Sequence, residues 1–298
     1  MKSMREREVL RWLAEKLPAI GDDAAVILFG DTHLVLTTDM LWRKTDFPEG
    51  TSAHTIGWRS VAVSLSDIAA MGAKPLGVVL ALGAPDFGRE FLGELLQGAL
   101  DCCQRVNAPY VGGDLSRHTE LTLVSSVLGE AKRLVRRSGA RSGELVCVTG
   151  ALGRTAAALK FFESGGHAEA NKLFEFIPRV TEGLALAPYA TSMMDISDGL
   201  ARSLYQLSEA SRVGYRVRYG DLPVVPEIDK LARSETDRRE MVLHTGEDFE
   251  LLFTLPSKQL REAKNATALT VIGEVLEEGI WLEDQGKTSV LEDRGYEH

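Results

Sequence analysis

Two aspartates lie three residues apart at the point where a short apolar run leads into a helical pattern. The segment SMMDISDGLARSL, residues 192–204, contains Asp195 and Asp198 with Ser197 between them. Either Ser197 or Asp198 would be enough to cap the first turn of the helix by accepting a backbone N–H. A helix cap therefore leaves Asp195 without an explanation.

Other carboxylates stand at the ends of apolar segments along the chain. Because α/β sheets form their binding crevices at strand ends, we treat these residues as candidates for one shared site. The stretches GDDAAV, LVLTTDM, YVGGDLS and HTGEDFE supply Asp22, Asp23, Thr37, Thr38, Asp39, Asp114, Glu247 and Asp248.

Asp67 lies inside a predicted helix over residues 51–72, beside the apolar stripe of that helix. Its neighbours one turn away are Val63, Ser64, Ala70 and Met71. A buried carboxylate without a partner costs several kcal/mol, so Asp67 requires a cation or hydrogen-bond donors. An internal salt bridge or a helix-cap contact is the alternative to a ligand role.

Several carboxylates in one place repel one another unless cations neutralise them. Few lysines or arginines lie within these motifs, which favours divalent ions. Oxygen ligands from Asp, Thr and Ser suit Mg²⁺ rather than Zn²⁺, and Mg²⁺ commonly holds phosphates against proteins. The pattern therefore predicts a nucleotide site. Separate turn and cap aspartates are the alternative, and that interpretation fits Asp22 and Asp31 well.

Glycine-rich turns before helices are candidates for phosphate binding. The segment VTGALGRTAAALKFF runs from a predicted strand through Gly150 and Gly153 into a helix, whose first amides could bind phosphate oxygens. Gly112-Gly113-Asp114 is similar, although glycines also simply end strands. Arg137 and Arg179 are candidate phosphate clamps, with an ordinary surface position as the alternative.

Composition limits the class of protein. A chain of 298 residues, 44% of them hydrophobic, suits one large domain or two ordinary ones. The net charge of -9 argues against a nucleic-acid or membrane-surface partner. No apolar run reaches about 18 residues, and the N-terminus reads as an amphipathic helix. Cys102, Cys103 and Cys147 show no CxxC spacing, which favours a cytoplasmic location.

The hydrophobic pattern predicts two α/β halves, 1–137 and 138–298, with a joint near 135–142. The first half should contain a hairpin at Val26–Phe29 and Leu34–Thr37, helices over 51–72 and 88–106, and strands over 75–85, 108–114 and 121–131. The second half should contain strands over 144–148 and 192–196, helices from about 153, between Pro178 and Pro188 and over 198–210, and late strands within 248–256 and 270–284.

Eight motifs occur in a characteristic order across residues 21–254: GDDAAV, TTDM, VSLSDIAAMGAKP, GGD, RSGA, VTGALG, MDISDGL and GEDFELLFT. With these motifs the chain resembles the thiamine-monophosphate kinase family of the aminoimidazole-ribonucleotide synthetase-like superfamily. The resemblance implies an N-terminal mixed-sheet domain that binds ATP and Mg²⁺ and pairs with a second subunit in a barrel-like homodimer. It also implies a C-terminal α/β domain and an ATP site partly shared between subunits.

The resemblance also assigns roles to individual residues. Gly113, Arg137 and Ser197 fall where the family contacts ATP, and Glu247 falls where it contacts thiamine phosphate. Several Mg²⁺ ions would be held by Asp23, Thr37, Thr38, Asp39, Asp67, Asp114, Asp195 and Asp198.

The departures from the family pattern gather on the acceptor side. Asp46 stands where the family usually has a substrate-contacting histidine. Tyr296 is our candidate for the aromatic residue that commonly stacks on the substrate. Leu115 and Thr245 also replace the family's Thr and Gly.

The implied reaction transfers the γ-phosphoryl group of ATP directly and in line to thiamine monophosphate, giving thiamine diphosphate. Another ATP-using enzyme of the superfamily is an alternative, of the amidine-forming, selenophosphate or hydrogenase-maturation type. The selenophosphate type requires a reactive Cys near the N-terminus, whereas the first Cys here is Cys102, and the maturation type requires a C-terminal Cys, whereas this chain ends in GYEH. A non-catalytic nucleotide-binding regulator is the other alternative, and none of the metal ligands whose loss would mark it is missing.

Overall fold

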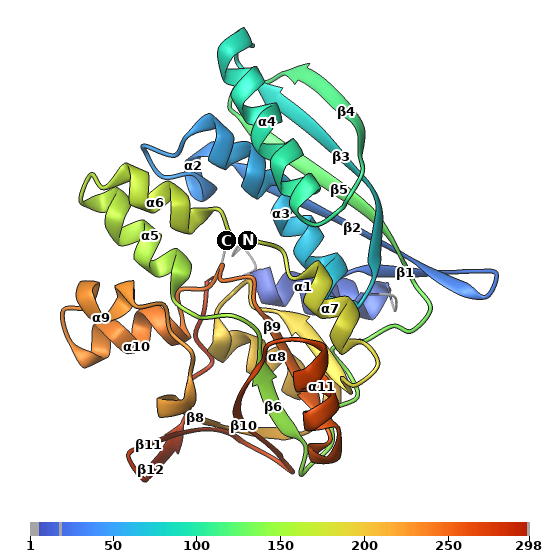
Figure 1. The fold of residues 1–298 in the computed structure, drawn as a ribbon, viewed down its shortest axis with the longest axis vertical. Coiled ribbons are helices and arrows are strands. Elements are labelled where there is room, and N and C mark those ends of the chain that lie inside the picture. Colours follow the sequence, from blue (N-terminus) through green and yellow to red (C-terminus); the bar gives the residue numbers. More distant parts are fainter. Residues whose placement is uncertain (1–5, 18–19, 297–298) are drawn as a thin grey trace.

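The computed structural model describes residues 6–17 and 20–296. Within them the chain forms two mixed β-sheets with helices packed on and between them (Figure 1). This arrangement confirms the predicted α/β class. None of the described helices has the length and apolar character needed to cross a bilayer.

The N-terminal half builds a five-stranded sheet in the order β1-β2-β5-β3-β4, in which β3 and β4 run parallel and the other neighbours antiparallel. Its elements are α1 (Glu6–Lys16), β1 (Ala25–Phe29), β2 (Thr32–Trp42), α2 (Arg43–Asp46), α3 (Ala53–Ala70), β3 (Lys74–Ala84), α4 (Arg89–Arg105), β4 (Tyr110–Arg117) and β5 (Thr122–Ala131).

The C-terminal half builds a seven-stranded sheet in the order β12-β11-β8-β10-β6-β9-β7, in which β11 and β8 run parallel and the other neighbours antiparallel. Its strands are β6 (Leu145–Val148), β7 (Ser192–Asp195), β8 (Gly214–Arg218), β9 (Leu251–Leu255), β10 (Thr270–Leu276), β11 (Ile280–Asp284) and β12 (Lys287–Val290). Its helices are α5 (Arg154–Glu163), α6 (His167–Phe174), α7 (Val180–Leu186), α8 (Leu200–Ser211), η1 (Tyr219–Asp221), α9 (Glu227–Leu231), α10 (Glu235–Leu243), η2 (Ser257–Gln259) and α11 (Leu260–Ala266).

Helix α3 lies between the two halves and is buried along nearly its whole length. It begins where the Ser52 side chain accepts the backbone N–H of Thr55, as an N-cap serine does. The side chains of α3 are mostly apolar or small on every side of the helix, which is typical of a helix that is packed on all sides. One continuous apolar cluster joins Ile68 of α3 to Cys147 and Phe253 of the second sheet. The two sheets are therefore packed together through α3.

Successive side chains of β2 point to opposite faces of the five-stranded sheet. Thr37 and Asp39 point toward α3, where they contact Asp67 and Ser64. Thr38 points to the other face, where Ser126 of β5 donates a hydrogen bond to its hydroxyl over 3.0 Å.

The predicted helices and strands are confirmed wherever the hydrophobic pattern was strong. The hairpin turns through Gly30 at φ 59°, with Phe29 opposite Thr32. The first sheet ends at Ala131 and the second begins at Leu145, on either side of the predicted joint. A domain boundary at residue 137 stays a prediction. The three cysteines are buried free thiols, as expected.

Candidate active site

Three carboxylates from distant parts of the sequence meet between the two sheets. Oxygens of Asp23, Asp67 and Asp195 all lie within 4.8 Å of one another. Asp23 precedes β1, Asp67 lies in the last turn of α3, and Asp195 ends β7. Asp195, which a helix cap left unexplained, is therefore part of a carboxylate cluster that both halves of the chain contribute to.

Hydroxyl groups of β2 and α3 hold these carboxylates in place. Thr37 Oγ1 donates to Asp67 Oδ2 over 2.5 Å, and Ser66 Oγ donates to Asp195 Oδ2 over 2.5 Å. Asp39 joins the group because Ser64 Oγ donates to its Oδ2 over 2.6 Å. We refer below to Asp23, Asp39, Asp67 and Asp195 as the carboxylate cluster.

Arg137 supplies one positive charge beside the cluster. Its Nη2 donates to Asp23 Oδ1 over 2.8 Å, and its backbone N–H donates to Asp22 Oδ1 over 2.9 Å. Although burial acts to lower the pKa of the Arg137 guanidinium, the charge and hydrogen bond of Asp23 raise it above its ordinary value. This arginine stays charged and compensates only part of the negative charge around it.

Burial, together with the remaining repulsion, raises the pKa values of carboxylates in the cluster. Burial raises the pKa of Asp195 to about 7, and the charge of Asp23 adds to that shift. Burial also raises the pKa of Asp67 well above its ordinary value, with Asp39 as the largest charged contributor. Burial raises the pKa of Asp39 as well. Full ionisation near neutral pH therefore requires a cation in addition to Arg137.

The donor atoms of the cluster fit Mg²⁺. Among the described residues, Asp23 Oδ2 is buried without a hydrogen-bond partner, although its companion Oδ1 is bound. A buried carboxylate oxygen without a donor is costly unless something else binds it. Oxygen-only ligands of carboxylate and hydroxyl type are those that Mg²⁺ prefers.

A second group of predicted site residues gathers at the start of α8. The backbone N–H of Glu247 donates to Ser197 O over 2.5 Å, and the backbone N–H of Tyr296 donates to Asp198 O over 3.1 Å. Gly246, with φ 81°, lies so close to Ser197 and Asp198 that a Cβ there would meet their backbone. Ser197, predicted to contact ATP, and Glu247 and Tyr296, predicted to contact the acceptor, are thus neighbours.

Thr38, Gly113 and Asp114 lie apart from the carboxylate cluster within the chain. Asp114 is opposite Ala81 in the pairing of β4 with β3, on the edge strand of the sheet. It is exposed and, like Thr38, belongs to the face that points away from α3. Since neighbouring side chains of a strand alternate, Thr38 and Asp39 cannot both face the cluster. Ligand roles for these residues stay predictions.

Asp46 also differs from a simple substrate contact. Its carboxylate is buried, and Oδ2 accepts the backbone N–H of Trp42 and the hydroxyl of Thr45, both over 2.7 Å. The side chain thus stabilises its own turn at α2, and its negative charge acts on Arg59 of α3.

The glycine turn before α5 is occupied by the chain's own carboxylates. Asp248 Oδ2 accepts the backbone N–H of Gly153 over 2.8 Å. Arg179, the second candidate clamp, forms two 2.6 Å hydrogen bonds with Glu250, whose Oε2 also accepts from Thr149. These contacts favour a structural role for the turn and for Arg179, and phosphate binding there stays a prediction.

Three residues of the site were missed by the sequence analysis: Ser64, Ser66 and Arg59. Ser64 lies one helical turn before Asp67, a spacing that places both side chains on one face. Arg59 and Asp67 are the only Arg, Lys, Asp or Glu residues in α3. A charged residue inside such an apolar helix was the feature of the sequence that could have indicated a role for Arg59.

The fold and the carboxylate cluster define a protein of the AIR synthase-related class. Residues 21–131 match the family described as AIR synthase related protein, N-terminal domain. Thiamine-monophosphate kinase of Halobacterium salinarum is 48% identical over 91% of this chain and 93% of its own. That of Methanospirillum hungatei is 43% identical over 93% of each chain. The chain belongs to the thiamine-monophosphate kinase family.

A solved structure of the same family has a closely similar fold. The structure described as AaThiL complexed with AMPPCP and TMP superposes with a TM-score of 0.88 at 27% identity, covering 100% of this chain and 99% of that one. The similarity extends over both sheets, so it includes the two halves that contribute to the carboxylate cluster.

Proposed function

We propose that this chain transfers the γ-phosphoryl group of ATP to thiamine monophosphate, giving thiamine diphosphate and ADP, in a Mg²⁺-dependent reaction. The observation that carries the proposal is the carboxylate cluster, which lies in a fold shared with a relative solved with AMPPCP and TMP. The identity of 48% with a thiamine-monophosphate kinase over most of the chain supports the same substrates.

Several Mg²⁺ ions would be held by the carboxylate cluster, with Thr37 and Asp198 as further oxygen ligands. When bound, Mg²⁺ neutralises charge on the phosphates and so favours phosphoryl transfer. Arg137 fixes one oxygen of Asp23 and leaves the other, Oδ2, to bind a cation. Ser197 would donate a hydrogen bond to an ATP phosphate oxygen from the turn before α8.

The acceptor needs no general base. Its phosphate is already ionised, so one of its oxygens attacks the γ-phosphorus in line as the bond to the β-phosphate oxygen breaks, and no proton has to be removed. The work of the chain is to position and desolvate the reactants. Glu247 and Tyr296, next to Ser197 and Asp198, would lie on the acceptor side, and Asp46 would act there through Arg59.

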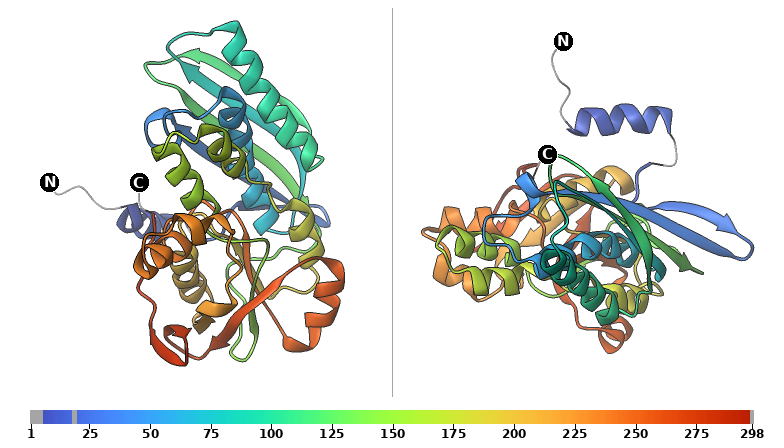
Figure 2. Two further views of the ribbon diagram at one scale, coloured as in Figure 1. Left: turned by 60° about the vertical axis from the view of Figure 1, so that its left-hand side comes forward. Right: turned by 90° about the horizontal axis from the view of Figure 1, so that it is seen from above.

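We also propose that the enzyme is a homodimer. Helices α3 and α4 lie against one face of the five-stranded sheet (Figure 2). The opposite face exposes apolar side chains that include Met40, 66% exposed, and Leu36, 43% exposed. Thr38 and Asp114 belong to the same face, so a second copy packed there would bring these predicted ligands into a shared site. The buried free thiols support a cytoplasmic location.

The fate of the γ-phosphoryl group tests the reaction. With γ-labelled ATP, Mg²⁺ and thiamine monophosphate, the label should appear in thiamine diphosphate, one for each ADP formed. An amidine-forming relative would instead release the label as inorganic phosphate, because ATP there activates an oxygen that leaves. Label found only as free phosphate would contradict the kinase proposal, and tight Mg·ATP binding without ADP formation would indicate a regulator.

A further inference from the structure

Arg59 is a fully buried cation in the middle of α3. Its guanidinium lies 3.6 Å from the centre of the Phe174 ring, and its Nη1 donates to Phe174 O over 3.0 Å. The rings of Phe176 and Phe249, stacked on each other at 4.2 Å, lie 5.5 and 5.9 Å from it. Cation–π contacts of this kind strengthen when water is excluded.

Two acidic residues compensate the charge of this arginine, and both belong to the acceptor side. Arg59 Nη2 forms an ion pair with Glu247 Oε2 at 3.1 Å. Burial lowers the pKa of the Arg59 guanidinium, whereas the charges of Glu247 and Asp46 act in the opposite direction. Among the described residues, Arg59 Nε and Nη2 are buried without a hydrogen-bond partner, so the contact of Nη2 with Glu247 is an ion pair. A buried charge with incomplete partners is costly, so Arg59 is not explained by stability alone.

We propose that Arg59 is a positioning residue for acceptor recognition, which holds the Glu247 carboxylate in its binding orientation. The proposal rests on the proposed function, in which Glu247 contacts thiamine monophosphate. It adds a residue from α3 that touches no substrate itself and acts through Glu247, with which it forms an ion pair.

The backbone of Glu247 is fixed independently of its side chain. Its N–H donates to Ser197 O, its carbonyl accepts from Thr155 Oγ1 over 2.6 Å, and its φ of 56° is unusual for a residue with a side chain. The ion pair with Arg59 supplies the contact that directs the carboxylate. Because Arg59 engages Oε2, Oε1 is left to accept a hydrogen bond from the acceptor's aminopyrimidine group.

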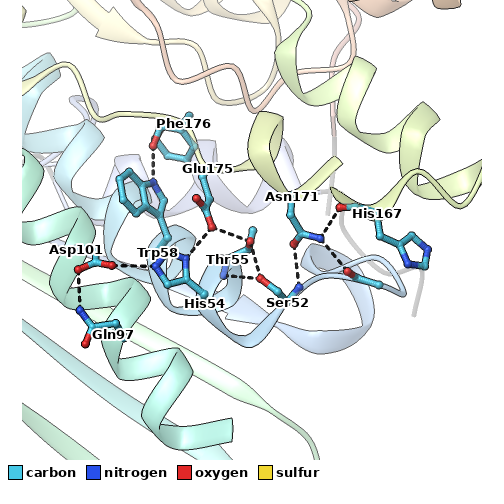
Figure 3. A network of polar contacts seen from close by, with 11 residues as sticks. Ser52, His54, Thr55, Trp58, Gln97, Asp101, His167, Asn171, Glu175 and Phe176 are labelled. Atoms are coloured by element: carbon cyan, nitrogen blue, oxygen red, sulfur yellow. Dashed lines mark hydrogen bonds and ion pairs between the residues drawn. The ribbon is translucent and has the colours of Figure 1, made fainter. Parts of the chain in front are cut away.

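A network of polar contacts joins the segment of Glu175 and Phe176 to the start of α3 (Figure 3). Glu175 Oε1 accepts from Thr55 over 2.8 Å and lies 2.8 Å from His54 Nδ1. Trp58 Nε1 donates to Phe176 O over 2.6 Å. The segment that carries Phe174 and Phe176 is thereby tied to the first turns of α3, on the N-terminal side of Arg59. Such support keeps a binding side chain in a single orientation before the substrate arrives.

The test is a comparison of KM values for the two substrates. Arg59→Gln should raise the KM for thiamine monophosphate about ten- to hundred-fold, the loss expected for a hydrogen bond to a charged group. The KM for ATP and the kcat at saturating acceptor should stay close to those of the wild type. Arg59→Lys keeps the charge without the planar fork and should restore part of the acceptor affinity.

Arg238→Gln is the matched control. Arg238 also stacks on an aromatic ring, that of Tyr219 at 5.4 Å, and donates to an acidic residue, Asp229, over 2.9 Å. It belongs to α10, and its polar partners are Asp229 and Tyr219 rather than Glu247, so its loss should leave both KM values unchanged. The double variant Arg59→Lys with Glu247→Gln should raise the acceptor KM no further than Glu247→Gln alone, because both substitutions disrupt the same Arg59–Glu247 interaction.

Equal rises in the KM for ATP and for the acceptor would overturn the proposal, as would additive effects in the double variant. If Arg59→Gln does not fold, the KM values of Arg59→Lys for the two substrates test the proposal in the same way. If the wild type shows no turnover with thiamine monophosphate, the proposed function fails. Calorimetry with thiamine monophosphate then tests Arg59 separately, and the proposal requires weaker binding by Arg59→Lys than by the wild type.

Discussion

At the scale of single residues, the carboxylate cluster places stability and function in opposition. Asp67 is held close to Asp39 and Asp195, and burial together with their charges raises its pKa well above the ordinary value. Without a metal this arrangement costs free energy near neutral pH. A bound cation removes the repulsion and stabilises the native state, since anything that binds the folded chain preferentially does so.

This opposition predicts an unusual response to Asp67→Asn. Without Mg²⁺ the variant should unfold at the same temperature as the wild type or a higher one, because one repelling charge is gone. Millimolar Mg²⁺ should raise the unfolding temperature of the wild type much more than that of the variant. Turnover should fall at least about 100-fold, the loss expected when an enzyme loses a group that stabilises charge in the transition state. Calorimetric unfolding with and without Mg²⁺, together with the kinase assay, measures all three.

Asp31→Asn is the control for this prediction. Asp31 is exposed in the hairpin turn between β1 and β2. Its replacement should change neither the stabilisation by Mg²⁺ nor the activity. A wild-type response to Mg²⁺ in Asp67→Asn would exclude the metal role.

At the scale of secondary-structure elements, α5 begins at a buried carboxylate rather than at a ligand. Asp248 Oδ2 accepts from Gly153, and its Oδ1 accepts from Thr155 over 3.3 Å. Burial raises the pKa of Asp248 to about 7, although these backbone N–H donors act to lower it. The folded chain therefore retains this proton at pH values where the unfolded chain, with a pKa near 3.8, has lost it.

The linkage gives a pH-dependent prediction for Asp248→Asn. The stability that comes from a raised carboxyl pKa is fully present below about pH 3.8 and is lost as the pH rises through about 7. The free energy of unfolding of the wild type should thus decline relative to that of the variant as the pH rises from about 3.8 to about 7, by at most about 1.4 kcal/mol per pH unit, and should level off at higher pH. Urea unfolding at several pH values measures this difference.

Asp221→Asn provides the comparison. Asp221 is paired with Arg218 at the surface, and its replacement should leave the pH dependence of unfolding as it is in the wild type. If Asp248→Asn and Asp221→Asn show the same pH dependence, Asp248 is ionised in the folded chain and the prediction is wrong.

The same elements show what the sequence could and could not predict. α3 and β3 have strong periodic patterns and were predicted within a few residues. The short helices α9 and α10 were missed, because their mostly polar sequences carry little periodicity. The separation of Thr38 from Thr37 follows from strand alternation alone. The occupation of the α5 turn by Asp248 did not, since it depends on a contact between residues about 95 positions apart.

At the scale of the whole molecule, one face of the five-stranded sheet remains uncovered by helices (Figure 2). It exposes Phe29 at 65% and Met40 at 66%, among other apolar side chains. Exposed apolar surface of this kind commonly marks an interface. In a two-fold symmetric dimer each substitution occurs twice, so one change near the axis has a doubled effect.

Met40→Asp should therefore separate the proposed dimer into monomers. Burying a carboxylate without a partner costs several kcal/mol, and the symmetric interface would contain two. Because Thr38 and Asp114 belong to the same face, the monomer should also lose kinase activity while its fold survives. Val290→Asp, at a position 59% exposed on β12, is the control and should remain dimeric and active. Sedimentation velocity measures the assembly, and circular dichroism measures the fold. The interface would be rejected if the wild type sediments as a monomer at micromolar concentration, or if the Met40→Asp variant stays dimeric and active.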